Sequence, residues 1–83
     1  MSLIRFNDEV EITGILAGED GQTLWLFAYS GSLKLIGNSN SSDPENRFLI
    51  SGQITIQQYE LIQLLYDATL QKWLIMDYWK RII

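Results

Sequence analysis

The longest regular pattern of apolar and polar positions predicts one amphipathic helix over residues 56–68. Thr55 can serve as its N-cap with Gln58 at the capping-box spacing, and neither glycine nor proline interrupts the run that follows. At about 100° per residue, three polar side chains fall in one wedge, while aliphatic side chains fill the opposite side with Leu65 at its centre. The polar wedge consists of Glu60, Gln63 and Asp67.

Two tyrosines add an aromatic flank to this predicted helix. Tyr59 and Tyr66 are seven positions apart, so they lie along one side of a helix, between its polar and aliphatic parts. The apolar arc is therefore wider than the stripe of about 100° that a helix needs to sit on a sheet. Either the rest of the domain wraps the helix, or the tyrosine flank contacts a partner protein.

Alternation of apolar and polar residues predicts four strands before the helix. They are expected at residues 9–17, 22–29, 32–37 and 47–53. Asp20 with Gly21, and Ser30 with Gly31, are two-residue turn signals, so the first three strands are expected to form an antiparallel meander. The polar segment 37–46 contains the single proline and is predicted to be a solvated loop.

The end of the chain predicts a further strand. Residues 71–79 are almost continuously apolar and aromatic, as in a strand that is buried on both faces. The order β-β-β-β-α-β describes one α+β domain over residues 1–83, with an antiparallel sheet of four to five strands and one helix packed on it. A small barrel of OB or SH3 type is the alternative, because FNDEVEITGIL resembles the first strand of such a barrel.

Composition excludes several classes of function. The 83 residues are 47% hydrophobic, which is typical of a globular chain, and include neither cysteine nor histidine. A disulfide framework, a thiolate or histidine metal site, and a Cys–His or Ser–His nucleophile are therefore excluded. No segment reaches the ~18 apolar residues of a membrane span, and the start lacks the apolar core of a signal peptide. We expect a cytoplasmic protein without membrane contact.

Charge and loop chemistry point away from nucleic acids, metals and cofactors. The formal net charge of −4 disfavours direct binding to phosphate backbones. In the loop 37–46 only Asp43 and Glu45 are charged, and the donors lack the EF-hand spacing, so we expect no metal site. Two acidic clusters are interpreted as solvated strand edges that discourage aggregation, not as catalytic pairs. They are Asp8 with Glu9 and Glu11, and Glu19 with Asp20.

The function expected from the sequence is a non-enzymatic protein-interaction or accessory subunit, either a homodimer or part of a larger complex. Its contact residues are expected on the helix and the last strand, at the aromatic positions that interfaces favour. They are Tyr59, Tyr66, Trp73 and Trp79. The alternative is a small acidic inhibitor or decoy that binds a basic nucleic-acid-binding protein, which requires the acidic residues on one face. An enzyme or ligand carrier would need a cavity that a chain of this size can scarcely hold, and none is expected.

Overall fold

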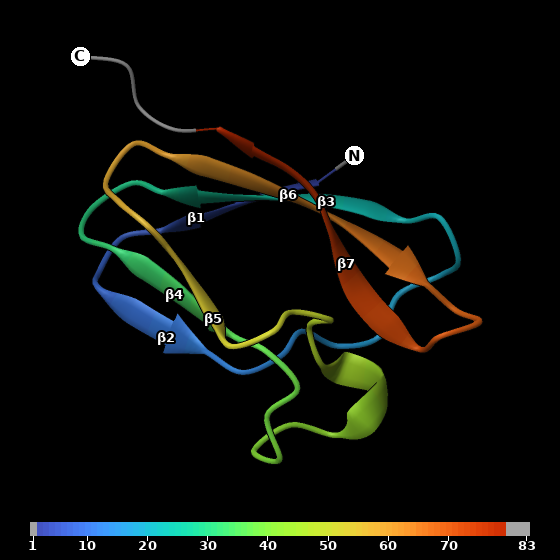
Figure 1. Cartoon of the computed structure of the whole chain (residues 1–83). Helices are drawn as coiled ribbons and strands as arrows, with labels where there is room; N and C mark the ends of the chain where they lie inside the picture. Colours follow the sequence, from blue (N-terminus) through green and yellow to red (C-terminus); the bar gives the residue numbers. More distant parts are fainter. Residues whose placement is uncertain (1, 80–83) are drawn as a thin grey trace.

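The computed structural model describes residues 2–79 and consists of strands joined by turns and loops (Figure 1). The strands are β1 (Ser2–Phe6), β2 (Val10–Ile12), β3 (Thr23–Ala28), β4 (Leu33–Ile36), β5 (Gln53–Ile56), β6 (Leu61–Asp67) and β7 (Lys72–Trp79). Within the described part of the chain the one helical element is the 3₁₀ turn η1 (Pro44–Asn46). The predicted α+β fold is therefore wrong, because no helix packs on a sheet.

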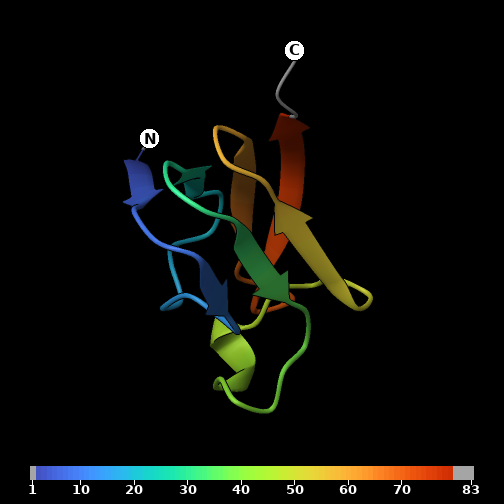
Figure 2. The same ribbon diagram turned by 90° about the vertical axis from the view of Figure 1, so that its left-hand side faces the viewer.

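The strands form two mixed sheets that pack face to face (Figures 1 and 2). One sheet has four strands in the order β1-β3-β6-β7, and the other has three in the order β2-β4-β5. The pairs β1/β3 and β2/β4 are parallel, and the remaining pairs are antiparallel. Only isolated bridges link other segments, so the sheets do not close, and the barrel alternative is also wrong.

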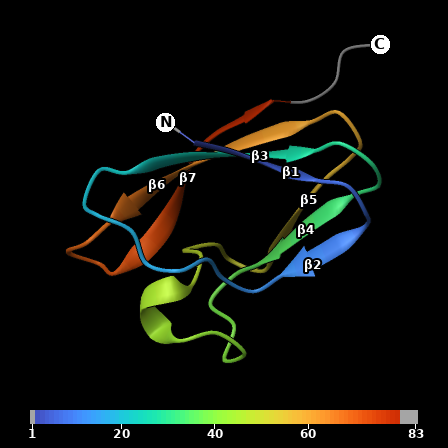
Figure 3. The same ribbon diagram turned by 180° about the vertical axis from the view of Figure 1, so that it is seen from behind.

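Three corners at one end of the molecule carry the chain between the sheets. β1 leads into β2, β3 into β4 and β5 into β6, as the continuous chain in Figure 3 shows for the first pair. Neighbouring corners are tied by backbone hydrogen bonds, from Tyr29 N to Phe6 O (3.0 Å) and from Tyr59 N to Ala28 O (2.6 Å). Gly31 has a φ of +81°, and a Cβ there would lie 2.8 Å from the amide nitrogen of Glu9. Glycine is therefore required at this corner.

The core lies between the sheets and is built from alternate residues of the strands. The buried hydrophobic residues are Leu24, Leu26, Ala28, Leu33, Leu35, Phe48, Ile56, Ile62, Leu64, Tyr66 and Trp73. Trp73 anchors one part of this core. Its ring packs edge to face on Tyr66 with the ring centroids 5.0 Å apart, and its Nε1 donates to Ile15 O at 3.1 Å. The Tyr66 hydroxyl in turn donates to Glu45 O at 2.9 Å. Both polar aromatic groups thus have partners inside an apolar core, as burial requires.

The segment predicted as a helix is the end of β5, a turn and β6. In β6 burial alternates strictly, with Ile62, Leu64 and Tyr66 inside and their neighbours half-buried on the other side. Leu65, predicted at the centre of a buried helical face, therefore lies on the outer side of the sheet. The pattern misleads because leucines occupy both faces of this strand, which imitates the wide apolar arc of a helix. Pairing with two neighbouring strands outweighs the helix propensity of the segment.

The other strand predictions are partly right. The strands expected at 22–29 and 32–37 and in the last segment, 71–79, are confirmed as β3, β4 and β7. Of the segment 9–17, only the three residues of β2 form a strand. Of the segment 47–53, only the final residue belongs to a strand, β5.

The predicted meander is wrong, because β2 pairs in parallel with β4 while β3 lies in the other sheet. Gly21 does adopt a positive φ of +83° in a turn closed by a hydrogen bond from Gln22 N to Glu19 O, but this turn does not join paired strands. In residues 2–79 we find no helix with the length and apolarity needed to cross a membrane.

Candidate functional site

The outer face of the four-stranded sheet is the main candidate surface, because its outward positions are rich in apolar residues. Leu24, Leu26 and Ala28 point into the core, so the residues between them on β3 point outward, and the same alternation applies on β6. The strand register places on this face the apolar side chains of Leu3, Trp25, Phe27, Leu61, Leu65 and Leu74. All six are at least partly accessible, and Leu3 is 44% exposed.

Cross-strand pairing arranges these side chains in rows. One row runs from Leu3 on β1 through Trp25 and Gln63 to Asp77 on β7. The next row begins with Arg5 on β1 and continues through Phe27 to Leu61. Directly paired residues on one face of a sheet lie about 4.5–5.5 Å apart at Cβ, so the apolar members form a contiguous patch.

An aromatic cluster marks the rim of this face next to the corners. Phe27 contacts Tyr29 edge to face, with ring centroids 6.2 Å apart, and stacks with Tyr59 at 6.5 Å. The two tyrosines are 52% and 54% exposed. Tyrosines of this kind offer a large, rigid contact area with a polar hydroxyl at the tip.

Tyr59 is held in an unfavourable backbone conformation. Its φ is +71°, the left-handed region, which a bulky side chain avoids at a cost of about 1–2 kcal/mol. The turn is fixed by hydrogen bonds from Glu60 N to Gln57 O (3.0 Å) and from Gln57 N to the buried Glu60 carboxylate (2.7 Å). Strain of this kind persists where the surrounding structure enforces it, and it clusters at functional sites.

Tyr59→Asn is expected to stabilise the folded protein by about 0.5–1 kcal/mol, because asparagine tolerates the left-handed region and only one exposed aromatic contact is lost. Equilibrium urea denaturation would measure the change. Tyr29→Asn is the matched control: it makes the same replacement in the same cluster, at a residue without a positive φ, and should not stabilise. Equal effects at both positions would show that backbone strain at Tyr59 is not relieved.

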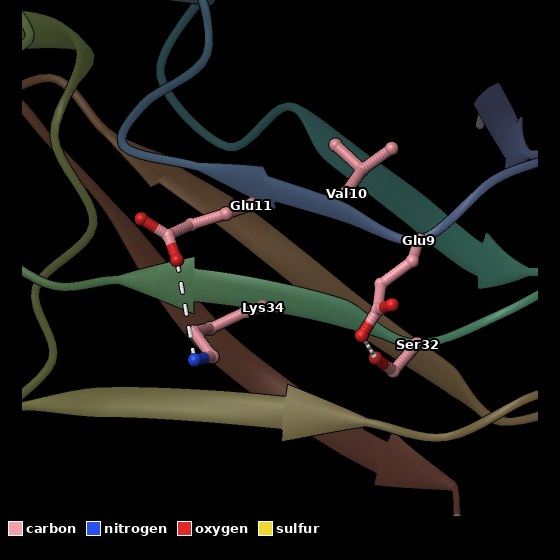
Figure 4. Close-up of a pocket in the computed structure, with 5 residues that line it drawn as sticks. All are labelled: Glu9, Val10, Glu11, Ser32 and Lys34. Atoms are coloured by element: carbon pink, nitrogen blue, oxygen red, sulfur yellow. Dashed lines mark hydrogen bonds and ion pairs between the residues drawn. The ribbon is translucent and has the colours of Figure 1, made fainter.

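A shallow depression of about 220 Å³ lies on the outer side of the other sheet (Figure 4). Lys34 Nζ is 3.9 Å from a carboxylate oxygen of Glu11, and Ser32 Oγ donates to Glu9 at 3.1 Å. Val10 points to the opposite side of its strand and packs against the core. The Glu11 and Lys34 side chains are more than a third exposed, and paired positions on adjacent strands account for their contact.

The structure separates the four residues predicted as contact sites. Tyr59 is exposed, whereas Tyr66 and Trp73 are core residues with 3% and 1% exposure. The backbone of Trp79 pairs with Leu61 at the end of β7, and its side chain lies outside what the structure describes. Of the three proposed contact residues whose side chains the structure describes, only Tyr59 is thus found at the candidate surface.

The apolar residues of the outer face were missed by sequence reasoning. A usable signal was present in TLWLFA, where Trp25 and Phe27 alternate with Leu24 and Leu26. A strand that is apolar at every position is covered on both faces, by its own core on one side and by something else on the other.

The acidic residues do not share one face. Asp8 and Glu9 lie at the corner between β1 and β2, and Glu11 lies within β2. Asp20 belongs to the loop between β2 and β3, which reaches the opposite end of the molecule (Figure 1), and its carboxylate accepts from Ala68 N at 3.0 Å. Within residues 2–79, no group of three or more acidic side chains could hold a metal ion. The two acidic clusters singled out in the sequence therefore lie apart from one another.

Comparison with known proteins gives no further guide: no family model matches the chain, and neither a curated protein nor a solved structure shows significant similarity to it.

Proposed function

We propose that this domain is a non-enzymatic protein-interaction module that binds another protein through the outer face of its four-stranded sheet. One observation carries the proposal: side chains from all four strands make this face contiguous and largely apolar, although the core lies on the other side of the sheet. Soluble monomers rarely expose apolar patches larger than a few hundred Å² unless they serve an interaction.

The composition of the face favours a protein partner over a nucleic acid. Trp25 and the exposed pair Tyr29 and Tyr59 belong to the residue types that dominate binding energy at protein interfaces. The described strands place two cations on this face, Arg5 and Lys72, and Lys72 Nζ donates to Pro44 O. Two are too few for binding along a phosphate backbone. A cytoplasmic location is part of the proposal and rests on the sequence alone.

Lysine substitutions test which face binds. Leu65→Lys should abolish retention of a protein partner, because it places a charge in the centre of a contact that must be dry. Ile36→Lys is the matched control, since Ile36 is also a half-buried aliphatic residue on the outer side of a sheet, paired with Gln53 on β5.

Association of each variant would be followed by sedimentation of the pure protein and by capture from an extract of the cells that make it. A partner lost with Leu65→Lys and kept with Ile36→Lys supports the proposal. The proposal is contradicted if the two variants retain the partner equally, or if no partner protein is retained at all.

A further inference from the structure

We propose that the occupant of this face is a second copy of the same chain, related by a two-fold axis that lies in the contact plane and runs parallel to the strands. The inference rests on the proposed function, and it adds the identity of the partner and the geometry of the contact. It is carried by the distribution of charge around the apolar patch.

Opposite charges flank the patch at its two edges. Arg5 lies on the edge strand β1 and is paired with Phe27, whose side chain points outward. Asp77 lies on the other edge strand, β7, and is paired with Gln63, which also points outward. Both charged residues are exposed. The face therefore carries Arg5 at one edge and Asp77 at the other, both toward the end with the corners, and apolar side chains between them. Lys72, at the far end of β7, donates from Nζ to Pro44 O at 2.9 Å.

A two-fold axis parallel to the strands and between β3 and β6 makes this arrangement self-complementary. It places β1 of each copy over β7 of the other, and β3 over β6, so that the apolar middle strands meet. Arg5 lies one row from Asp77 of the second copy, a step of two residues or about 7 Å along a strand, within reach of a long side chain. The contact then has two equivalent ion pairs at its rim.

A second two-fold axis is conceivable, which also lies in the contact plane but runs perpendicular to the strands. The position of Arg5 disfavours it. This axis would place β1 over β1 and β7 over β7, so that Arg5 would face a strand without an acidic residue. Arg5 would then have no carboxylate opposite it, and the contact would lose the charge complementarity that favours one orientation over another. The position of Arg5 thus favours the axis parallel to the strands.

The size of the sheet sets the expected strength. Four strands at ~4.8 Å spacing and ~6 residues at ~3.4 Å each give a flat area of about 400 Å² per copy, or ~800 Å² for two. The tyrosines at the rim add to this, but the total stays near the ~1,000 Å² at the low end of specific interfaces. We therefore expect a reversible dimer with a dissociation constant in the micromolar range.

Charge exchange between two variants tests the geometry directly. Arg5→Asp places a carboxylate at both rim positions, and Asp77→Arg places a guanidinium at both. Each variant alone should dimerise at least ~10-fold more weakly than the parent protein in sedimentation velocity experiments. An equimolar mixture of the two should regain association, because every rim contact between unlike variants again joins a carboxylate to a guanidinium.

Recovery in the mixture cannot arise from damage to either fold, so it separates a contact effect from destabilisation. Lys34→Asp, on the outer side of the other sheet, is the control and should leave dimerisation unchanged. Arg5→Gln removes the charge without reversing it and should weaken the dimer less than Arg5→Asp.

Three outcomes overturn the inference: a protein that stays monomeric up to about 1 mM, a dimer indifferent to both charge reversals, or a mixture that does not recover. The proposed function fails separately. It survives a monomeric protein whose partner is lost with Leu65→Lys but kept with Ile36→Lys, and it fails when those two lysine variants behave alike.

Discussion

Trp73→Ala is expected to remove a large part of the free energy of unfolding of this domain. The Trp73 side chain is 1% exposed, packs edge to face on Tyr66, and donates from Nε1 to Ile15 O. Its backbone also bonds to Arg47 O and Leu49 N, which holds the segment after η1 against β7. Truncation of a buried tryptophan costs about 3–5 kcal/mol. A domain of 83 residues has roughly 4–12 kcal/mol in total.

Two companion variants separate the causes of that loss. Trp73→Phe keeps a buried ring but leaves Ile15 O without its donor, which should cost about 1–3 kcal/mol. Leu74→Ala is the matched control, since the next residue along β7 is half-buried and points to the outer face. Urea denaturation monitored by far-UV circular dichroism would measure all three. If Trp73→Ala costs no more than Leu74→Ala, the faces of β7 are reversed.

The local sequence pattern was sufficient to locate a strand where apolar and polar residues alternate over a short stretch. In SLKLIG, Leu33 and Leu35 are buried, and Lys34 points away from the core, as the alternation predicts. β3 and β7 were located equally well, because aromatic and aliphatic residues fill them and turn residues bound them. The positions of these three strands depend on neighbouring residues and could therefore be predicted from the sequence, whereas β6 was mistaken for a helix.

Strand pairing could not be obtained in this way. The parallel pair β1/β3 joins Ser2–Phe6 to a strand that begins at Thr23, and no turn residue specifies such a contact. The Asp20 and Gly21 signal favoured a hairpin, yet the chain uses that turn to enter a different sheet. Corners that cross between sheets depend on distant partners, such as the fit of Gly31 against Glu9.

The sequence predicted that the contact surface is aromatic, but not which residues form it. An aromatic contact area was expected, but Tyr66 and Trp73 belong to the core, and Trp25 and Phe27 take the outward positions. When a strand is apolar on both faces, the sequence does not indicate which face is turned to the core. That choice depends on the strands paired with it on either side.

Two adjacent leucines, Leu64 and Leu65, give the sharpest test of the fold, because the helical pattern and the structure assign the buried position to different members of the pair. The helical pattern places Leu65 in the core, where Leu65→Ala would cost about 2–5 kcal/mol. In the structure Leu64 is fully buried between the sheets, and Leu65 is half-buried on the outer face. Leu64→Ala should therefore cost about 2–5 kcal/mol, and Leu65→Ala less than about 1.5 kcal/mol at low protein concentration.

The difference between these two variants should also depend on protein concentration. If the outer face binds a second copy, dimer formation stabilises the folded state by mass action, and Leu65→Ala removes part of that gain. The cost of Leu65→Ala should then grow as the concentration rises from well below to well above the dissociation constant, while the cost of Leu64→Ala stays nearly constant. Denaturation at two concentrations measures both. A larger cost for Leu65→Ala than for Leu64→Ala in the dilute sample would contradict the register of β6.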